Sequence, residues 1–234
     1  MEIINLLRNF IASQKLDDGN LDGLCEILDQ QEKKLKTSTN PANLKRCINL
    51  EGFDACGKST ISLLLRENLQ NSRLLQTPPL LVSRYRSFFD KQEETIRRLF
   101  YNLGNLIVSN ELIDTTHNDE LLILDRYWPS TIAYKLARQT EKSLESINNE
   151  LVWPNYLNKP TRILYLFVPE DERLRRIEKR SVQVPITLEE EQLKNEQTFR
   201  HRLDKIYRQI PDVEIIDANR PPTEIVRDIL QNYV

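Results

Sequence analysis

The sequence predicts an α/β fold in which a five-stranded parallel sheet carries helices on both faces. Three observations indicate this fold. Short apolar runs alternate with longer amphipathic segments along most of the chain, as in consecutive βαβ units. The run at residues 121–124 is continuously apolar, which is typical of a strand covered on both faces. A phosphate-binding motif follows the first run, in the strand–loop–helix setting that it requires.

That motif is GFDACGKST at residues 52–60, which fits the pattern G-x-x-x-x-G-K-[ST]. Two of the five glycines in the chain fall on its required positions. Glycines let the backbone N–H groups point at phosphate oxygens, and the helix that follows adds the positive end of its dipole. We expect Lys58 to reach the β- and γ-phosphates of a nucleotide and the Ser59 hydroxyl to bind Mg²⁺. An ordinary turn before a helix is the weaker alternative.

The composition is typical of a globular domain and disfavours a nucleic-acid-binding or membrane-spanning protein. The chain has 234 residues, of which 39% are hydrophobic and 29% charged, enough for one sizeable α/β domain. The net charge of −2 gives no overall field that favours nucleic acid or a membrane surface. No apolar run is long enough to span a bilayer. The three cysteines lack metal-site spacing and favour a reducing compartment.

The segment before the first strand is predicted to form two short helices. Apolar residues recur there at helical spacing: Ile3, Ile4, Leu7, Phe10 and Ile11, then Leu21, Leu24, Ile27 and Leu28. Residues 37–41 have the composition of a linker. We therefore predict a helical leader over residues 1–45, with a role in packing or docking, and one domain over residues 46–234.

The elements of that domain follow in order. The predicted strands are residues 47–51, 74–77, 121–124, 163–168 and 213–216. The second strand ends at two prolines, which cannot donate to a sheet ladder. The predicted helices are residues 61–66, 93–113, 131–147, 170–181 and 221–233.

Charged residues follow two of the strands. Asp125 and Arg126 end the third strand, and ligands of parallel α/β sheets bind at the carboxyl ends of strands. An acid there can hold Mg²⁺, and an arginine can bind phosphate. A surface ion pair is the alternative, which the nearby phosphate motif disfavours. Arg84 and Arg86 follow the second strand, where a phosphate-binding role and a solvated loop are equally good interpretations.

A third basic group lies on the predicted helix 170–181, where Arg173, Arg176 and Arg180 share one face. In isolation such a helix is more often a solvated charged face. Here it leads into a polar stretch, and together they are typical of a kinase lid. Lid arginines stabilise the transferred phosphoryl group, and closure excludes water. We place the lid at about residues 178–192.

Together these motifs resemble the thymidylate kinase-like nucleoside monophosphate kinases, over about residues 20–234. The segments that carry the resemblance are GFDACGKST, FDKQEETIRRLFYNLGNLIVSNELI, LLILDRYWPSTIAY, VWP, and PEDERLRRIEKRS with the later TFRHRL. Within the family the chain looks most like the members that phosphorylate UMP and CMP in mitochondria. The resemblance implies the P-loop kinase fold with an arginine-bearing lid, ATP as phosphoryl donor, Mg²⁺ as cofactor and a pyrimidine nucleoside monophosphate as acceptor.

The resemblance also implies roles for individual residues. The donor is expected against Gly52, Asp54, Ala55, Cys56, Gly57, Lys58, Ser59, Thr60, Arg173 and Asn219. The acceptor is expected against Asp54, Arg86, Tyr101, Asn105, Arg126, Ser130 and Tyr134. The implied metal ligands are Ser59 and Asp125. The implied catalytic residues are Lys58, Asp125, Arg126, Arg176 and Arg180.

Two positions depart from the family pattern. Ala55 stands where many thymidylate kinases have an arginine, so a lid arginine must supply that charge. Asn105 stands where they carry an arginine that reads thymine. An amide both donates and accepts and can flip, so Asn105 can serve uracil and cytosine alike. We therefore predict that UMP, CMP, dCMP or dUMP is preferred over dTMP.

Other functions stay open. One is the same reaction on dTMP. Another is a deoxynucleoside kinase, which needs a general base, and Glu51 is the nearby carboxylate. A third is a nucleotide-binding protein without turnover, from which we would expect Lys58 or the lid arginines to have been lost.

The sequence leaves two further questions open. A homodimer is compatible with it. The family resemblance implies mitochondria, whereas the acids Glu2, Asp17 and Asp18 argue against an organelle presequence and favour the cytoplasm.

Overall fold

The structure is a computed structural model that describes residues 2–14, 21–37, 44–113, 119–181 and 188–234. These residues contain a five-stranded sheet in the order β2-β3-β1-β4-β5. Every pairing between neighbouring strands is parallel, which confirms the predicted sheet. The strands are β1 (Arg46–Glu51), β2 (Ser72–Gln76), β3 (Leu121–Asp125), β4 (Arg162–Phe167) and β5 (Val213–Asp217).

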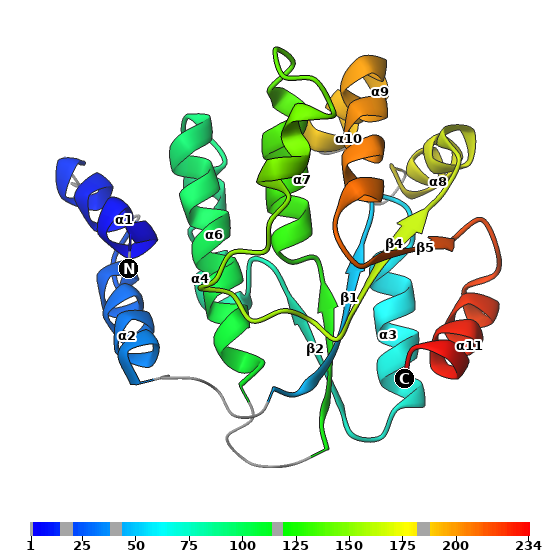
Figure 1. The fold of residues 1–234 in the computed structure, drawn as a ribbon, viewed down its shortest axis with the longest axis horizontal. Helices are drawn as coiled ribbons and strands as arrows, with labels where there is room; N and C mark the ends of the chain where they lie inside the picture. The colour runs from blue at the N-terminus through cyan, green and yellow to red at the C-terminus, as the bar shows by residue number, and fades with distance from the viewer. Residues whose placement is uncertain (1, 15–20, 38–43, 114–118, 182–187) are drawn as a thin grey trace.

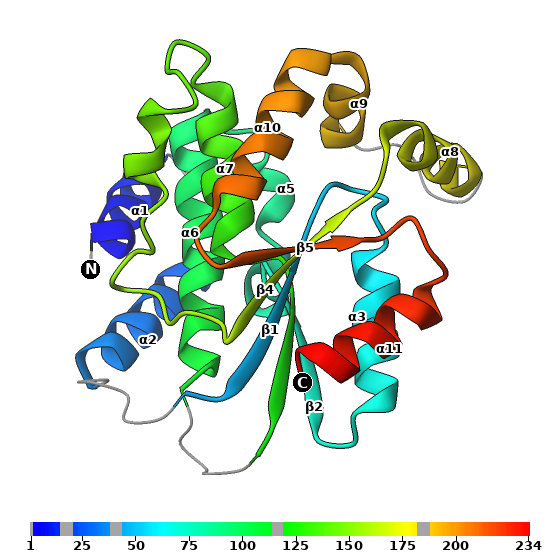
Figure 2. The ribbon, with the colours of Figure 1, turned by 45° about the vertical axis from the view of Figure 1, so that its right-hand side comes forward.

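Helices cover both faces of the sheet (Figures 1 and 2). On one face lie α3 (Lys58–Asn68) and α11 (Pro222–Asn232), and on the other α6 (Glu94–Glu111), α7 (Trp128–Arg138) and α10 (Gln197–Gln209). The remaining helices are α1 (Glu2–Ser13), α2 (Leu24–Thr37), α4 (Leu80–Ser83), α5 (Arg86–Phe89), α8 (Glu170–Ser181), α9 (Leu188–Asn195) and the 3-10 helix η1 (Ser146–Glu150). No helix within the described ranges is both long and apolar enough to cross a bilayer.

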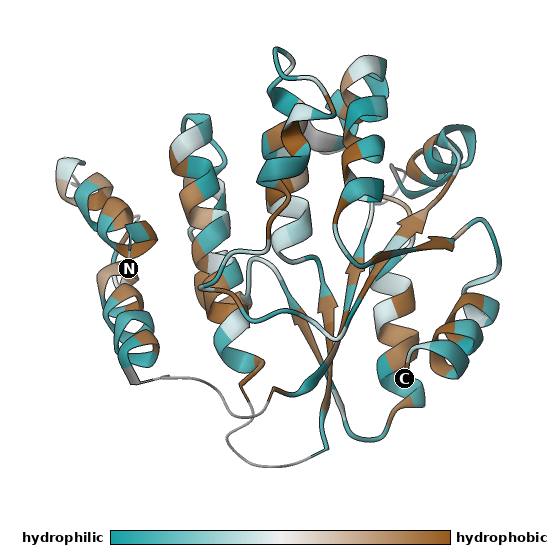
Figure 3. Cartoon of the chain, in the orientation of Figure 1, coloured by the Kyte–Doolittle hydropathy of each residue, from teal (hydrophilic) through white to brown (hydrophobic). Residues whose placement is uncertain are grey.

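Strand β3 is apolar from Leu121 to Leu124 because each face of the sheet has its own core. In β3, Leu122 and Leu124 pack in the core beneath α6, α7 and α10, whereas Leu121 and Ile123 pack in the core beneath α3 and α11. Side chains of a strand alternate between faces, so a strand buried on both sides needs an uninterrupted apolar run. Figure 3 shows the result as brown strands inside helices that mix brown and teal.

Both predicted ends of the helix over residues 131–147 are wrong. It begins earlier, at Trp128, with Pro129 in the first turn, where a missing N–H costs nothing. It ends at Arg138, and η1 follows after a turn. The backbone N–H of Ser146 donates to Ser143 Oγ (3.2 Å), a local bond that competes with helix continuation. The helices α4, α5, α9 and α10 were not predicted as elements.

The two predicted N-terminal helices are confirmed as α1 and α2, and both pack against α6. Their apolar residues, including Ile4, Leu7 and Leu24, belong to the same core as α6 and α7. The division into a leader and a domain stays a prediction. Most of the predicted linker at residues 37–41 lies outside the described residues.

Candidate active site

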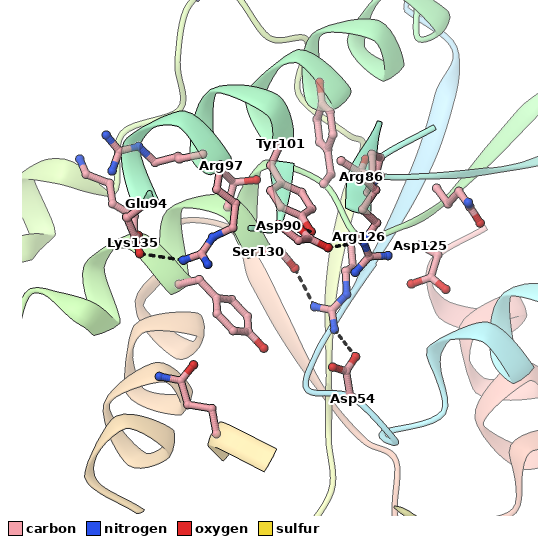
Figure 4. Close-up of a pocket in the computed structure, with 18 of the residues that line it drawn as sticks. Asp54, Arg86, Asp90, Glu94, Arg97, Tyr101, Asp125, Arg126, Ser130 and Lys135 are labelled. Carbon is pink, nitrogen blue, oxygen red and sulfur yellow. Dashed lines mark hydrogen bonds and ion pairs between the residues drawn. The ribbon is translucent and has the colours of Figure 1, made fainter. Parts of the chain in front are cut away.

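A cavity of about 670 Å³ opens at the carboxyl ends of β2 and β3. Its floor includes Asp54 of the phosphate loop and Asp125 and Arg126 at the end of β3. Its walls come from α5, α6, α7, α8 and α9. Figure 4 labels residues from the first three of these helices. Of the predicted acceptor residues, all but Asn105 line this cavity: Asp54, Arg86, Tyr101, Arg126, Ser130 and Tyr134.

The phosphate loop joins β1 to α3 and depends on its glycines. Gly52 and Gly57 have φ values of +143° and +102°, which side chains disfavour. A Cβ on Gly52 would lie 2.7 Å from both the Leu166 carbonyl oxygen and Cys56 Sγ. Lys58 Nζ donates to the carbonyls of Gly52 (3.0 Å) and Phe53 (2.9 Å). The Lys58 ammonium group therefore lies inside the loop and bridges two of its carbonyl groups.

The two predicted metal ligands meet beside this loop. Ser59 Oγ lies 3.0 Å from Asp125 Oδ2. Neighbouring oxygen ligands of an octahedral Mg²⁺, each about 2.1 Å from the metal, lie about 3.0 Å apart. The pair thus fits two adjacent positions around Mg²⁺. Within the described ranges no group of three or more His, Cys, Asp or Glu side chains is placed to hold a metal ion.

Arg126 is fixed at the cavity floor by two directed bonds. Its Nη2 pairs with Asp54 Oδ1 (2.6 Å), and its Nη1 donates to Ser130 Oγ (3.0 Å). Burial alone would raise the pKa of Asp54, but the charges of Arg126 and Lys58 outweigh it and lower the pKa to about 2. Asp54 is therefore ionised at neutral pH and holds the guanidinium in place.

Glu51 lies beneath Arg126 and is fully buried. Its carboxylate accepts bonds from the Tyr127 N–H (2.8 Å) and Ser130 Oγ (2.5 Å). Burial raises the pKa of Glu51 to about 7, although the Ser130 bond and the Arg126 charge oppose the shift. Glu51 is not among the residues that line the cavity.

One face of α6 supplies charged residues that the sequence analysis missed. Glu94, Arg97 and Arg98 line the cavity together with Tyr101. Glu94 pairs with Arg97 (3.0 Å), and the Tyr101 hydroxyl donates to Asp90 (2.8 Å). The three missed residues precede Tyr101 by seven, four and three positions, the spacing of one helical face. That spacing was a usable signal.

Asn105 lies behind the cavity wall rather than in it. Its side chain is fully buried, and its Nδ2 donates to Thr131 Oγ1 (2.9 Å). Its Oδ1 is buried with no hydrogen-bond partner among the described residues. Thr131, which the sequence analysis did not single out, lines the cavity. Thr131 therefore connects Asn105 to the cavity.

The three arginines of α8 have different surroundings. Arg176 lies over the phosphate loop, where its guanidinium donates to the carbonyls of Cys56 (3.3 Å) and Ala218 (3.0 Å). Arg180 pairs with Glu190 of α9, and both line the cavity. Arg173 is only 1% exposed and pairs with Glu170 (2.7 Å), so it points into the protein.

Two predicted regions lie beside the α8 arginines. Asn219 is exposed. It directly follows Ala218, whose carbonyl accepts a hydrogen bond from Arg176. Residues 182–187 of the predicted lid lie outside the described residues.

Comparison with known proteins relates this geometry to a family. A sequence model described as Thymidylate kinase matches residues 50–229. The human protein UMP-CMP kinase 2, mitochondrial, is 32% identical over 188 residues, which cover 78% of this chain and 41% of the human protein. This chain therefore spans about two fifths of that relative. A probable thymidylate kinase of Saccharolobus solfataricus is 24% identical over 80% of this chain and 96% of its own length.

Solved structures share the fold. A thymidylate kinase from Candida albicans has a TM-score of 0.60 and 22% identity, and the match covers 80% of this chain and 90% of that one. A deoxyadenosine kinase from M. mycoides with bound dATP has a TM-score of 0.54 and 18% identity, and the match covers 79% and 97%. These likenesses confirm the predicted P-loop kinase fold.

Proposed function

The chain belongs to the thymidylate kinase family of ATP-dependent nucleoside monophosphate kinases, and from this premise we propose that it transfers the γ-phosphoryl group of ATP to a pyrimidine nucleoside monophosphate. The acceptors we propose are UMP, CMP, dCMP and dUMP. The observation that carries the proposal is Arg126, held 2.6 Å from the phosphate-loop residue Asp54. A cation fixed there lies between the phosphate loop and a cavity large enough for a nucleotide.

The donor side rests on the phosphate loop and α3. Lys58 and the loop N–H groups would bind the β- and γ-phosphates, with Arg176 above the loop and Asn219 near the adenine. Mg²⁺, held at Ser59 and Asp125, would neutralise charge on the phosphate oxygens. Arg173 is buried, so its predicted contact with the donor would require a rearrangement of α8.

The acceptor side rests on α5, α6 and α7. Arg126 and Arg86 would bind the acceptor phosphate, while Tyr101 would stack on the base and Ser130 and Tyr134 would line the pocket. Arg180 would stabilise the charge of the transferred group. The attacking phosphate oxygen is already ionised near neutral pH, so positioning and charge neutralisation suffice and no general base is needed.

The base preference is proposed to pass through Thr131. When Asn105 Nδ2 donates to Thr131 Oγ1, as in this structure, the threonine hydrogen is directed elsewhere and suits an acceptor such as uracil O4. With the amide flipped, Thr131 would donate to Asn105 Oδ1 and offer a lone pair, which suits the amino group of cytosine. The buried Oδ1, which has no partner among the described residues, is consistent with this exchange.

Two rival functions have specific support. The archaeal relative is named a probable thymidylate kinase, so dTMP is the second acceptor candidate. The pKa of Glu51, about 7, would suit the general base of a nucleoside kinase. However, Glu51 does not line the cavity, which disfavours that rival.

The proposal is tested by a coupled assay with Mg·ATP across UMP, CMP, dCMP, dUMP, dTMP and the free nucleosides. We expect turnover with pyrimidine monophosphates and none with nucleosides. Lys58→Ala should abolish nearly all activity, and this separates catalysis from a contaminating kinase. A protein that binds ATP but turns over none of these acceptors would be a non-catalytic nucleotide-binding protein. The compartment stays a prediction, since only the name of the human relative refers to mitochondria.

A further inference from the structure

We propose that helix α1 and the turn before helix α2, Asp22 and Gly23, position part of the acceptor site, because they hold residues 84–90 in place. That segment contains Arg86 and Asp90, which line the cavity. The inference rests on the proposed function for the identity of the acceptor. The family match begins at residue 50, so both helices lie outside it.

The polar part of this restraint is one carbonyl group. The Asp22 carbonyl, on the turn that leads into α2, accepts hydrogen bonds from Arg84 Nη2 (2.7 Å) and from the Tyr85 hydroxyl (2.5 Å). The Tyr85 side chain is nearly completely buried, with 2% exposure. Gly23 has φ +76°, and a Cβ there would lie 2.8 Å from Arg84 Nη2. The left-handed backbone at this position therefore favours glycine, and a side chain there would also displace the Arg84 guanidinium.

The apolar part is a row of aromatic rings. Phe10 of α1 lies 6.3 Å from Phe88 and 6.0 Å from Phe89, measured between ring centroids. Phe89 in turn stacks on Phe100 of α6, with centroids 4.6 Å apart and planes at 7°. The residue after Phe100 is Tyr101, which lines the cavity. Residues 84–90 are thus held between α1 on one side and α6 on the other.

This segment needs an external restraint. Helices α4 and α5 have four residues each, far too few to be stable alone. The ion pair between Arg86 and Asp90 (3.3 Å) is half exposed, and such pairs stabilise little. Contacts with α1, with the turn before α2 and with α6 therefore hold the backbone that carries Arg86. Without them, acceptor binding would have to order the segment, which weakens affinity.

The test uses the full chain with Tyr85→Phe, which removes one hydroxyl and keeps the ring. Tyr85 is a positioning residue, so we expect the KM for the acceptor to rise about three- to tenfold. The KM for Mg·ATP and the thermal midpoint should change little. Phe10→Ala should act in the same direction. Gln31→Ala is the matched control, because it breaks a bond between α2 and α6 (Asn110 Nδ2 to Gln31 Oε1, 2.7 Å) that does not involve residues 84–90.

A second measurement does not depend on turnover. Hydrogen exchange of the substrate-free protein should quicken at residues 84–90 in Tyr85→Phe and stay unchanged in the phosphate loop. This result supports the inference even if none of the tested acceptors is phosphorylated, an outcome that would refute the proposed function alone. Unchanged exchange at residues 84–90 would overturn the inference. So would an equal rise in the KM of both substrates, or a rise of the same size in Gln31→Ala.

Discussion

Arg126 at the end of β3 and Asp54 in the phosphate loop are joined by an ion pair of 2.6 Å, although 71 residues separate them in the chain. The same guanidinium donates to Ser130 Oγ (3.0 Å). Its planar fork makes both bonds at once, which a lysine ammonium cannot reproduce from the same position. The Arg126 side chain therefore links the phosphate loop to α7, and this link depends on the shape of the guanidinium.

Arg126→Lys should therefore lower kcat/KM for the acceptor by about a hundredfold or more while the charge is kept. The measurement is steady-state kinetics with saturating Mg·ATP. Arg208→Lys, which alters a surface pair with Asp204, is the matched control and should keep nearly full activity. A loss of less than threefold in Arg126→Lys would show that the charge alone matters.

Glu51→Gln should change how stability depends on pH. The folded protein holds a proton on Glu51 up to a pKa of about 7, whereas the unfolded chain loses it near 4.5. Wild-type stability should then fall, relative to the variant, as pH rises from about 4.5 to about 7. The full difference is about 3 kcal/mol in favour of the variant. Urea unfolding at pH 5 and pH 8 measures it. Glu120→Gln is the control, because Lys45 lowers the pKa of Glu120.

The same Glu51→Gln variant separates two reactions. If the acceptor is a monophosphate, its attacking oxygen is already ionised, and activity should stay within about tenfold of wild type. If the chain is a nucleoside kinase that uses Glu51 as its base, activity should fall by about 10²–10⁴-fold. Initial rates with a monophosphate and with its free nucleoside decide between them.

Thr131→Val and Asn105→Leu should each lower kcat/KM for UMP and CMP by about two- to tenfold, because each removes a hydrogen bond. If Asn105 acts only through Thr131, the double variant should lose little more than Thr131→Val alone. Asn110→Leu, on the same helix but bonded to Gln31, is the control. Fully additive losses would mean that Asn105 contacts the base itself.

Ser59→Ala should raise the Mg²⁺ concentration for half-maximal activity by about tenfold, because it removes one of the two proposed oxygen ligands. The readout is a metal titration at constant ATP. Ser62→Ala is the matched control, since its hydroxyl bonds to the Ser59 carbonyl (3.0 Å) and faces the helix rather than Asp125. An unchanged metal dependence in Ser59→Ala would remove Ser59 from the proposed metal site.

The sequence predicted those features that depend on residues close together in the chain. The phosphate loop follows from its glycines and Lys58, and β3 follows from the uninterrupted apolar run that a strand covered on both faces needs. The face of α6 that bears Arg97 and Arg98 could also have been predicted, because helical spacing ties both to Tyr101. These signals act over a few residues and are visible in a single sequence.

Other features depend on which element packs against which. Asn105 is withdrawn from the cavity because α7 brings Thr131 in front of it. Arg173 shares its helical face with Arg176 and Arg180, yet a bond to Glu170 turns it inward. The spacing of the three arginines is the same in either arrangement. Sequence periodicity could therefore predict that they share a face but not which of them reaches the site.

The register of the sheet has a consequence for how such an enzyme can diversify. Strands β1 and β3 are direct neighbours, with Leu50 opposite Asp125, so a backbone ladder sets the spacing between the phosphate loop and Arg126. The walls of the cavity, where we propose that the acceptor base binds, come from helices outside that ladder. Under that proposal, substitutions in those walls would change nucleobase preference, while the strand pairing would keep the reacting groups in line. Nucleobase preference could then change during evolution while the phosphoryl-transfer chemistry stays the same.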